Sequence, residues 1–251
     1  MGGADARPAP ARSGADADAI GRLCDRTAPD LYALALRIIG GAGEAEEVVE
    51  QALLEAWTAR GDAETHATLL VRRCRSLALV RSGKRSIEST RRSPSLAEPH
   101  PLDDRARAAA ARALGRLGEG ELRLVAMAYF EGYSVVEIAA RTGAAPHEVL
   151  AGLARILGML QEEDGATAAH APGAMEPEGF EDACVLYAFD LLEGAEHERM
   201  VRLRPGDPAL VARLAARERS AALLALSAPP SRPGPDLRAR LVRAVAGATR
   251  A

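Results

Sequence analysis

The residues best suited to bind a partner are charged, and they gather in two neighbouring stretches of opposite sign. Between residues 44 and 55 there are acids and no base: Glu44, Glu46, Glu47, Glu50 and Glu55. From residue 66 to residue 92, eight bases oppose Glu88 alone, a local charge of eight minus one, or +7. A basic stripe of this kind favours binding to phosphates, and an acidic face beside it favours docking to a basic partner. Ordinary solvated helix faces are the other interpretation.

Residues 134–160 carry the pattern of two helices joined by a tight turn. Ser134 followed by Glu137 predicts a capping box at the start of a short helix that runs to Arg141, and Pro146 suits the first position of the next helix. The spacing predicts a helix-turn-helix, a motif that recognises DNA, with a generic helical hairpin as the other interpretation. The second helix is poorly basic: residues 134–163 hold two bases and four acids, a net of −2.

No set of residues predicts catalysis or metal binding. The five histidines are scattered, and no phosphate-binding loop, dinucleotide-binding glycine pattern or zinc-protease motif occurs. Cys24, Cys74 and Cys184 are far apart and odd in number, which excludes a disulfide framework or a zinc knuckle and favours a reducing compartment. We therefore expect no enzyme, no cofactor and no metal.

The elements that must position these residues are predicted to be helices. Hydrophobic residues make up 48% of the 251 residues but aromatic residues only 3%, so alanine, leucine and valine must build the cores. No segment alternates as a half-buried strand would. Residues 31–38 and 49–56 instead repeat apolar positions at helical spacing on either side of Gly40 and Gly41. We expect an all-α protein.

Proline, glycine and serine divide the chain into three helical blocks. The first block covers residues 18–86, the second block 104–163 and the third block 178–251, with linkers at 87–103 and 164–177 and a disordered start at 1–17. Short linkers of this composition predict blocks that move relative to one another. The start has no apolar core and no stretch is long enough to span a membrane, so a cytoplasmic protein is expected. A net charge of −3 excludes a simple polycationic nucleic-acid coat.

The first block resembles a known family in the order and spacing of three segments. Tyr32–Gly40, Ala45–Trp57 and Arg72–Leu79 with its basic tail are similar to region 2 of extracytoplasmic-function sigma factors. In that bacterial family, region 2 grips the clamp helices of the largest RNA polymerase subunit and melts and captures the promoter −10 element. Ser76 and Val80 stand where the family commonly has Asn and Asp, and Thr68 stands in place of an upstream aromatic residue.

The resemblance implies a role for each charged stretch. Residues implied to contact polymerase are Glu46, Glu47, Glu50 and Gln51, and residues implied to contact −10 DNA are Arg72, Arg75, Arg81, Lys84 and Arg85. Trp57 is expected in the core. The basic set would neutralise phosphates, while a captured base also needs a pocket.

The second block is similar to sigma region 4, which recognises the −35 element and docks on the polymerase flap. The segments that carry the likeness are Ala113–Leu117, Tyr129–Gly143 and Glu148–Val149. Lys and Arg are expected directly after Val149, but Leu150, Ala151 and Gly152 follow it. Only Arg141, His147 and Arg155 remain as candidate −35 contacts, and −35 binding is expected to be weak.

The third block is similar to the cytoplasmic helical domain of anti-sigma factors. The similar segments are Glu181–Arg199, Leu214–Leu226, Pro229–Pro230 and Leu237–Leu241. A zinc motif of that family would start at His197 and place its cysteines at Val201 and Arg204, so no zinc is expected. A plain helical extension is the other interpretation.

Three functional hypotheses follow. The first is a sigma factor that directs core RNA polymerase to promoter DNA and is autoregulated by its third block, acting intramolecularly or as an anti-sigma partner. The second is a degenerate sigma-like interaction protein that binds polymerase or a sigma factor without promoter recognition. A helix-turn-helix repressor ranks last, because it leaves the resemblance of the first block unexplained.

Overall fold

Alanine and leucine at helical spacing form helices wherever the chain is described. The computed structural model describes residues 13–60, 67–84, 103–165, 179–192, 197–198, 200 and 208–248. Its longer helices are α1 (Ser13–Ile39), α2 (Ala42–Arg60), α3 (Ala67–Arg81), α4 (Asp104–Gly115), α5 (Glu119–Val125), α6 (Val135–Thr142), α7 (Pro146–Asp164), α8 (Phe180–Ala188), α10 (Pro208–Leu223) and α11 (Asp236–Ala248). Two short helical turns are η2 (Ala126–Phe130) and η3 (Leu224–Ser227). No strand occurs in these ranges, and the all-α prediction is confirmed.

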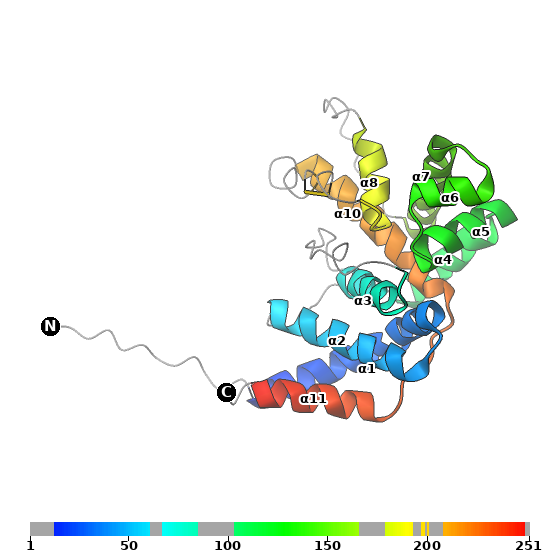
Figure 1. Ribbon diagram of the computed structural model, residues 1–251. Helices are drawn as coiled ribbons and strands as arrows, with labels where there is room; N and C mark the ends of the chain where they lie inside the picture. The colour runs from blue at the N-terminus through cyan, green and yellow to red at the C-terminus, as the bar shows by residue number, and fades with distance from the viewer. Residues whose placement is uncertain are drawn as a thin grey trace.

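Helices α1, α2 and α3 pack together, and α11 lies along α1 and α2 on the far side from α3 (Figure 1). Leu34, Leu53 and Leu79 are fully buried between the first three helices. The turn between α1 and α2 depends on Gly40, whose φ of 85° is a left-handed value that glycine adopts without steric cost. Trp57 is half-buried and packs against this core, in line with the prediction.

Helix α1 begins earlier than predicted and runs through a proline. It begins at Ser13, inside the stretch 1–17 that was expected to be disordered, with Asp16 in its first turn, where an acid interacts favourably with the helix dipole. It also continues through Pro29. Ala28 and Leu31 on either side are buried, so burial of this helix outweighs the loss of one main-chain donor.

The predicted helix-turn-helix geometry is present in α6 and α7. Ser134 Oγ accepts from Glu137 N at 3.3 Å, and Glu137 Oε2 accepts from Ser134 N at 2.8 Å, which is the predicted capping box. Gly143 ends α6 with a φ of 74°, and Pro146 is the first residue of α7. The local signals in this part of the sequence were sufficient to place both helices.

The helix before this motif is irregular. Helix α5 passes at Ala126 into η2, a π-helical turn, where Glu131 N donates to Ala126 O at 3.0 Å. The sequence predicts one regular helix here, since Leu122, Val125 and Tyr129 share a face. The wider turn leaves the carbonyl groups of its last residues available to a donor from outside the helix.

Helices α8 and α10 of the third block lie between α3 and the α4–α7 group (Figure 1). A segment over residues 228–235 then leads to α11, and Ser231 N donates to Pro29 O at 3.1 Å on the way. One hydrophobic core runs through all three blocks, from Ile20 to Val245, beside a smaller cluster around Phe180 and Leu214. The predicted linkers fall almost wholly outside the described residues.

Among the described helices, none combines the length and the apolar character that crossing a bilayer demands.

Phe189 tests whether the second and third blocks share one core. Its ring is fully buried, 6.4 Å from that of Tyr129 in an edge-to-face arrangement. Phe189→Ala removes this contact and leaves a cavity, and should lower the free energy of unfolding by roughly 3–5 kcal/mol. Urea unfolding should remain a single transition, because the core is continuous. A separate early transition in the variant, with the rest of the protein unchanged, would show that the blocks fold independently; Phe189→Leu is the milder control.

Candidate functional site

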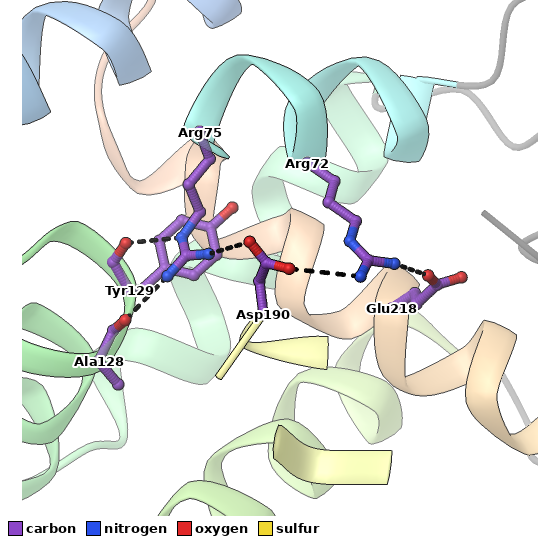
Figure 2. A network of polar contacts seen from close by, with 6 residues as sticks. All are labelled: Arg72, Arg75, Ala128, Tyr129, Asp190 and Glu218. Carbon is purple, nitrogen blue, oxygen red and sulfur yellow. Dashed lines mark hydrogen bonds and ion pairs between the residues drawn. The ribbon is translucent and has the colours of Figure 1, made fainter. Parts of the chain in front are cut away.

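Two of the bases on α3 that were predicted to bind DNA, Arg72 and Arg75, are covered by the third block. Arg72 and Arg75 point from α3 toward Asp190, which follows α8, and Arg72 also reaches Glu218 on α10 (Figure 2). Both carboxylates and both guanidinium groups are mostly buried. The four charges therefore form an internal network that joins α3 to the third block.

Arg75 holds the first block to the second. Its side chain is 2% exposed, and it donates from Nε to Tyr129 O at 2.7 Å and from Nη2 to Ala128 O at 2.9 Å. These are carbonyl groups of η2, so the guanidinium satisfies the end of the π-helical turn. The Tyr129 ring lies 4.6 Å from the Arg75 guanidinium carbon, and burial raises the pKa of the Tyr129 hydroxyl. Arg75 is a structural residue in this state.

Within the described residues, the partners of the Arg72 side chain belong to the third block. Arg72 is paired with Glu218, lies 3.5 Å from Asp190, and its guanidinium carbon is 4.2 Å from the centre of the Tyr187 ring. Burial by itself lowers the pKa of Arg72, but the carboxylates of Glu218 and Asp190 outweigh it and raise the pKa above its ordinary value. The cation is thus stabilised only while the two acids face it.

The backbone at Asp190 is what places its carboxylate between the two arginines. Asp190 N donates to Tyr187 O at 3.0 Å and Leu191 N donates to Leu186 O at 2.7 Å, the pattern of a Schellman motif at the end of α8. Asp190 occupies its left-handed position with a φ of 57°, where glycine is usual. A non-glycine residue there costs on the order of 1 kcal/mol, which the ion pairs with Arg72 and Arg75 offset.

The remaining bases predicted to contact −10 DNA have other partners or lie outside the described residues. Arg81 forms an ion pair with Glu47 of α2. Lys84 donates to Ile38 O at 2.9 Å and to Phe130 O at 3.4 Å, so it caps the ends of α1 and η2 while remaining exposed. Arg85 lies outside the described residues.

Two of the four residues predicted to contact polymerase are covered by α11. Arg240 donates to Glu50 Oε2 at 2.7 Å and to Glu46 Oε2 at 3.2 Å. The pKa of Arg240 is raised, chiefly by the hydrogen bond to Glu50, with Glu46 adding to it. Gly234 N also donates to Glu46 at 2.7 Å, and a Cβ at position 234 would lie equally close to that carboxylate.

The other two remain on the open side of α2. Glu47 has a side chain 64% exposed and pairs with Arg81, and Gln51 is exposed and donates to Glu55 at 2.9 Å. The four predicted residues are therefore not equivalent in this state.

Helix α11 is seated by apolar as well as charged contacts. Leu237, Leu241 and Val245 are buried against α1 and α2. Arg238 pairs with Asp25 at 3.2 Å and passes close to Gly21, where a Cβ would lie 2.7 Å from its guanidinium and would require the arginine side chain to shift. Glycine at position 21 leaves room for the charged edge of α11.

The three candidate −35 residues are exposed on α6 and α7, but two have partners within the second block. Arg141 stacks over Tyr133 at 3.8 Å and donates to Glu137 O, while Arg155 pairs with Glu121 at 2.7 Å. His147 is exposed in the first turn of α7. Glu148 accepts from Ala145 N at 2.8 Å and completes a capping box. The free positive charge of this surface is small.

Three residues of the site were not identified from the sequence: Asp190, Glu218 and Arg240. Glu218 carried a usable signal, because it lies four residues after Leu214 and three before Ala221 on the buried side of α10. A lone acid on an apolar stripe needs a buried cation as its partner. Asp190 and Arg240 offered no comparable signal. No group of three metal-binding side chains occurs in the described part of the chain, and positions 201 and 204 lie outside it.

No protein-family model, curated protein or solved structure matches this chain.

Asp190→Asn tests the network. Asparagine keeps the shape and tolerates the left-handed backbone but removes the charge between Arg72 and Arg75. Because two buried cations lose part of their compensation, the free energy of unfolding should fall by about 1–3 kcal/mol in a urea titration.

Asp190→Gly is the informative companion variant, since it removes the backbone strain together with the carboxylate. If the strain were the dominant feature, the glycine variant would be more stable than the native chain. We expect it to be less stable. Glu121→Gln, which breaks the exposed pair with Arg155, is the matched control and should change stability little.

Proposed function

We propose that this chain is a sigma-like transcription initiation factor that its third block holds in a self-inhibited state. The observation that carries the proposal is that the third block contacts residues of both predicted binding faces. Asp190 and Glu218 engage Arg72 on the DNA side, and Arg240 engages Glu46 and Glu50 on the polymerase side. At each place the third block presents the same sign of charge as the proposed partner. Its acids face Arg72, where DNA phosphates would bind, and its Arg240 faces the acids of α2, where a basic surface of polymerase would bind.

The tether makes this competition effective. A segment joined to its target by a short connection experiences a local concentration on the order of millimolar, so modest contacts suffice to cover a surface. Core RNA polymerase and promoter DNA are the partners that would have to displace α11 and the α8–α10 unit. Activation then requires a signal that weakens these contacts.

The proposed role is binding rather than catalysis, and its place is the cytoplasm, where polymerase and DNA are. It needs neither a metal nor a cofactor. The sequence resemblance of the first and second blocks to sigma regions 2 and 4 supports the choice of polymerase and promoter as partners.

A second candidate is a sigma-like interaction protein that binds polymerase or a sigma factor without recognising promoters. The burial of Arg75 and the internal pairs of Arg141 and Arg155 favour it. The two candidates differ in DNA binding. A promoter-binding factor whose third block is displaced would lose DNA affinity steeply as salt rises, because each phosphate contact releases counterions.

Arg240→Ala tests the masking of the polymerase face. The substitution frees Glu46 and Glu50 and weakens the seating of α11, so affinity for core polymerase should rise. Since the pair is about a third exposed, the gain should be about 2- to 10-fold in a binding titration.

Arg238→Ala is the matched control for this variant. Arg238 lies on the same helix and also forms an ion pair, but with Asp25, outside the predicted polymerase face. An equal gain in both variants would mean that general loosening of α11, and not exposure of the two acids, controls binding. No gain in either would count against masking by α11.

Run-off transcription tests the whole proposal. A chain that ends at Gly165, the residue that closes α7, lacks every contact of the third block. It should initiate transcription with core polymerase more strongly than the full chain, and Asp190→Asn combined with Glu218→Gln in the full chain should shift activity in the same direction.

Two results would decide against a promoter-specific factor. Silence of all three proteins, with core polymerase still bound in a pull-down, would favour the interaction protein. Silence together with loss of polymerase binding would remove the sigma-like interpretation altogether.

A further inference from the structure

The third block surrounds the Arg72 guanidinium with a set of groups that we call the cage: Tyr187, Asp190 and Glu218. The ring of Tyr187 lies 4.2 Å below the guanidinium carbon, Asp190 approaches one terminal nitrogen at 3.5 Å, and Glu218 pairs with the other. All three members belong to the third block, whereas the guest belongs to α3 of the first. The cage is thus a receptor for a group carried by a different part of the chain.

The members of the cage are fixed in place by the third block. Tyr187 is fully buried and His197 stacks on it, with ring centres 5.8 Å apart. Glu218 is 3% exposed on α10, and Asp190 is set by the Schellman motif at the end of α8. The helices α8 and α10 and the turn after α8 carry the three cage residues, and Arg72 is not part of any of them.

The chemistry of the cage selects one class of cation. A planar cation can lie over the Tyr187 ring while separate N–H groups reach two carboxylates, one in the turn after α8 and one on α10. Guanidinium has this shape and several donors in one plane, whereas an ammonium group is a compact point charge that is strongly hydrated. A carboxylate as buried as that of Glu218 is costly without such a partner.

We propose that the cage is a binding site for guanidino compounds, which Arg72 fills in the closed state and which an external guanidinium group fills when the third block moves away from α3. The external group is a free guanidino compound or an arginine side chain of another protein. This inference rests on the proposed function only for its consequence: a filled cage cannot recapture Arg72, so the ligand would hold the third block open. The binding site itself follows from the contacts.

Chemical rescue of Arg72→Ala in the full chain tests the site directly. The variant leaves Glu218 and Asp190 without their main cation and should lower the melting temperature by on the order of 10 °C. Guanidinium chloride at low millimolar concentration should then restore stability in a saturable manner, by roughly 3–6 °C at about ten times its Kd. Native protein should show no such gain, because its cage is full.

The controls separate the cage from general ion effects. Sodium chloride and methylammonium chloride at the same ionic strength should not rescue the variant, and Arg72→Ala combined with Glu218→Gln should no longer respond. Arg73→Ala is the matched arginine variant, since Arg73 pairs with Glu55 outside the cage, and guanidinium should not rescue it. Equal rescue by methylammonium, or rescue of Arg73→Ala, would overturn the proposal.

Hydrogen exchange of the native chain gives a second readout that does not require the variant to fold. A guanidino ligand that fills the open cage should speed the exchange of α3 and α10 amides in proportion to its concentration, while lysine amide should not. L-arginine amide and a short arginine-containing peptide distinguish the two sources, a small molecule or a protein side chain. No response to either, with no rescue of Arg72→Ala, would reject the site.

These outcomes are independent of transcription. Rescue, with neither transcription nor polymerase binding by the full chain that carries Asp190→Asn and Glu218→Gln, would leave the cage standing and remove the proposed function. Transcription that responds to truncation, with no rescue, would do the reverse.

Discussion

The carboxylate of Asp190 lies between the guanidinium groups of Arg72 and Arg75, and through them it contacts elements from all three blocks. Arg75 continues to the carbonyl groups of η2, and Arg72 continues to Glu218 on α10. Buried charges of this kind are tolerated only as a complete set, because removal of one member leaves the others uncompensated. The arrangement of α3 against η2 and against the α8–α10 unit therefore forms and separates together.

The two places where the third block covers the first differ in physical character. Around Arg72 the contacts are buried and backed by aromatic stacking, whereas Arg240 meets Glu46 and Glu50 with side chains that are between a fifth and a third exposed. Exposed pairs are weakened by salt, and buried pairs much less. The connection that leads to α11 is held at two points, where Ser231 N donates to Pro29 O and Gly234 N donates to Glu46. Within the proposed function, added salt would therefore weaken the Arg240 pairs before it weakens the network around Arg72.

Local signals in the sequence were enough to place most helices and could not assign partners to charges. Ser134, Glu137, Gly143 and Pro146 interact with residues a few positions away. Their spacing was therefore enough to place both ends of α6 and the start of α7. The sign of the stripe on α3 was equally clear, but which cation faces solvent depends on what packs over it, and the partners are distant in sequence: Glu218 lies 146 positions after Arg72, and Tyr129 lies 54 positions after Arg75. Arg75, a predicted DNA contact, is buried in this structure and donates to carbonyl groups of η2. The same limit applies to the π-helical turn, because the donor that satisfies its last carbonyl groups comes from another block.

The helix-turn-helix region has little positive charge available to contact a phosphate backbone. Arg155 is engaged by Glu121 and Arg141 by Tyr133, and the carboxylate of Glu148 closes the first turn of α7. Affinity for a phosphate backbone grows with the number of free cations that meet it. Of the described bases on α3, Arg72 and Arg75 are buried and Arg81 pairs with Glu47. If this chain binds DNA, the affinity must come from α3 after the third block has moved away. With the third block in place, DNA binding is then opposed both by the pairing of the α3 cations and by the covered surface.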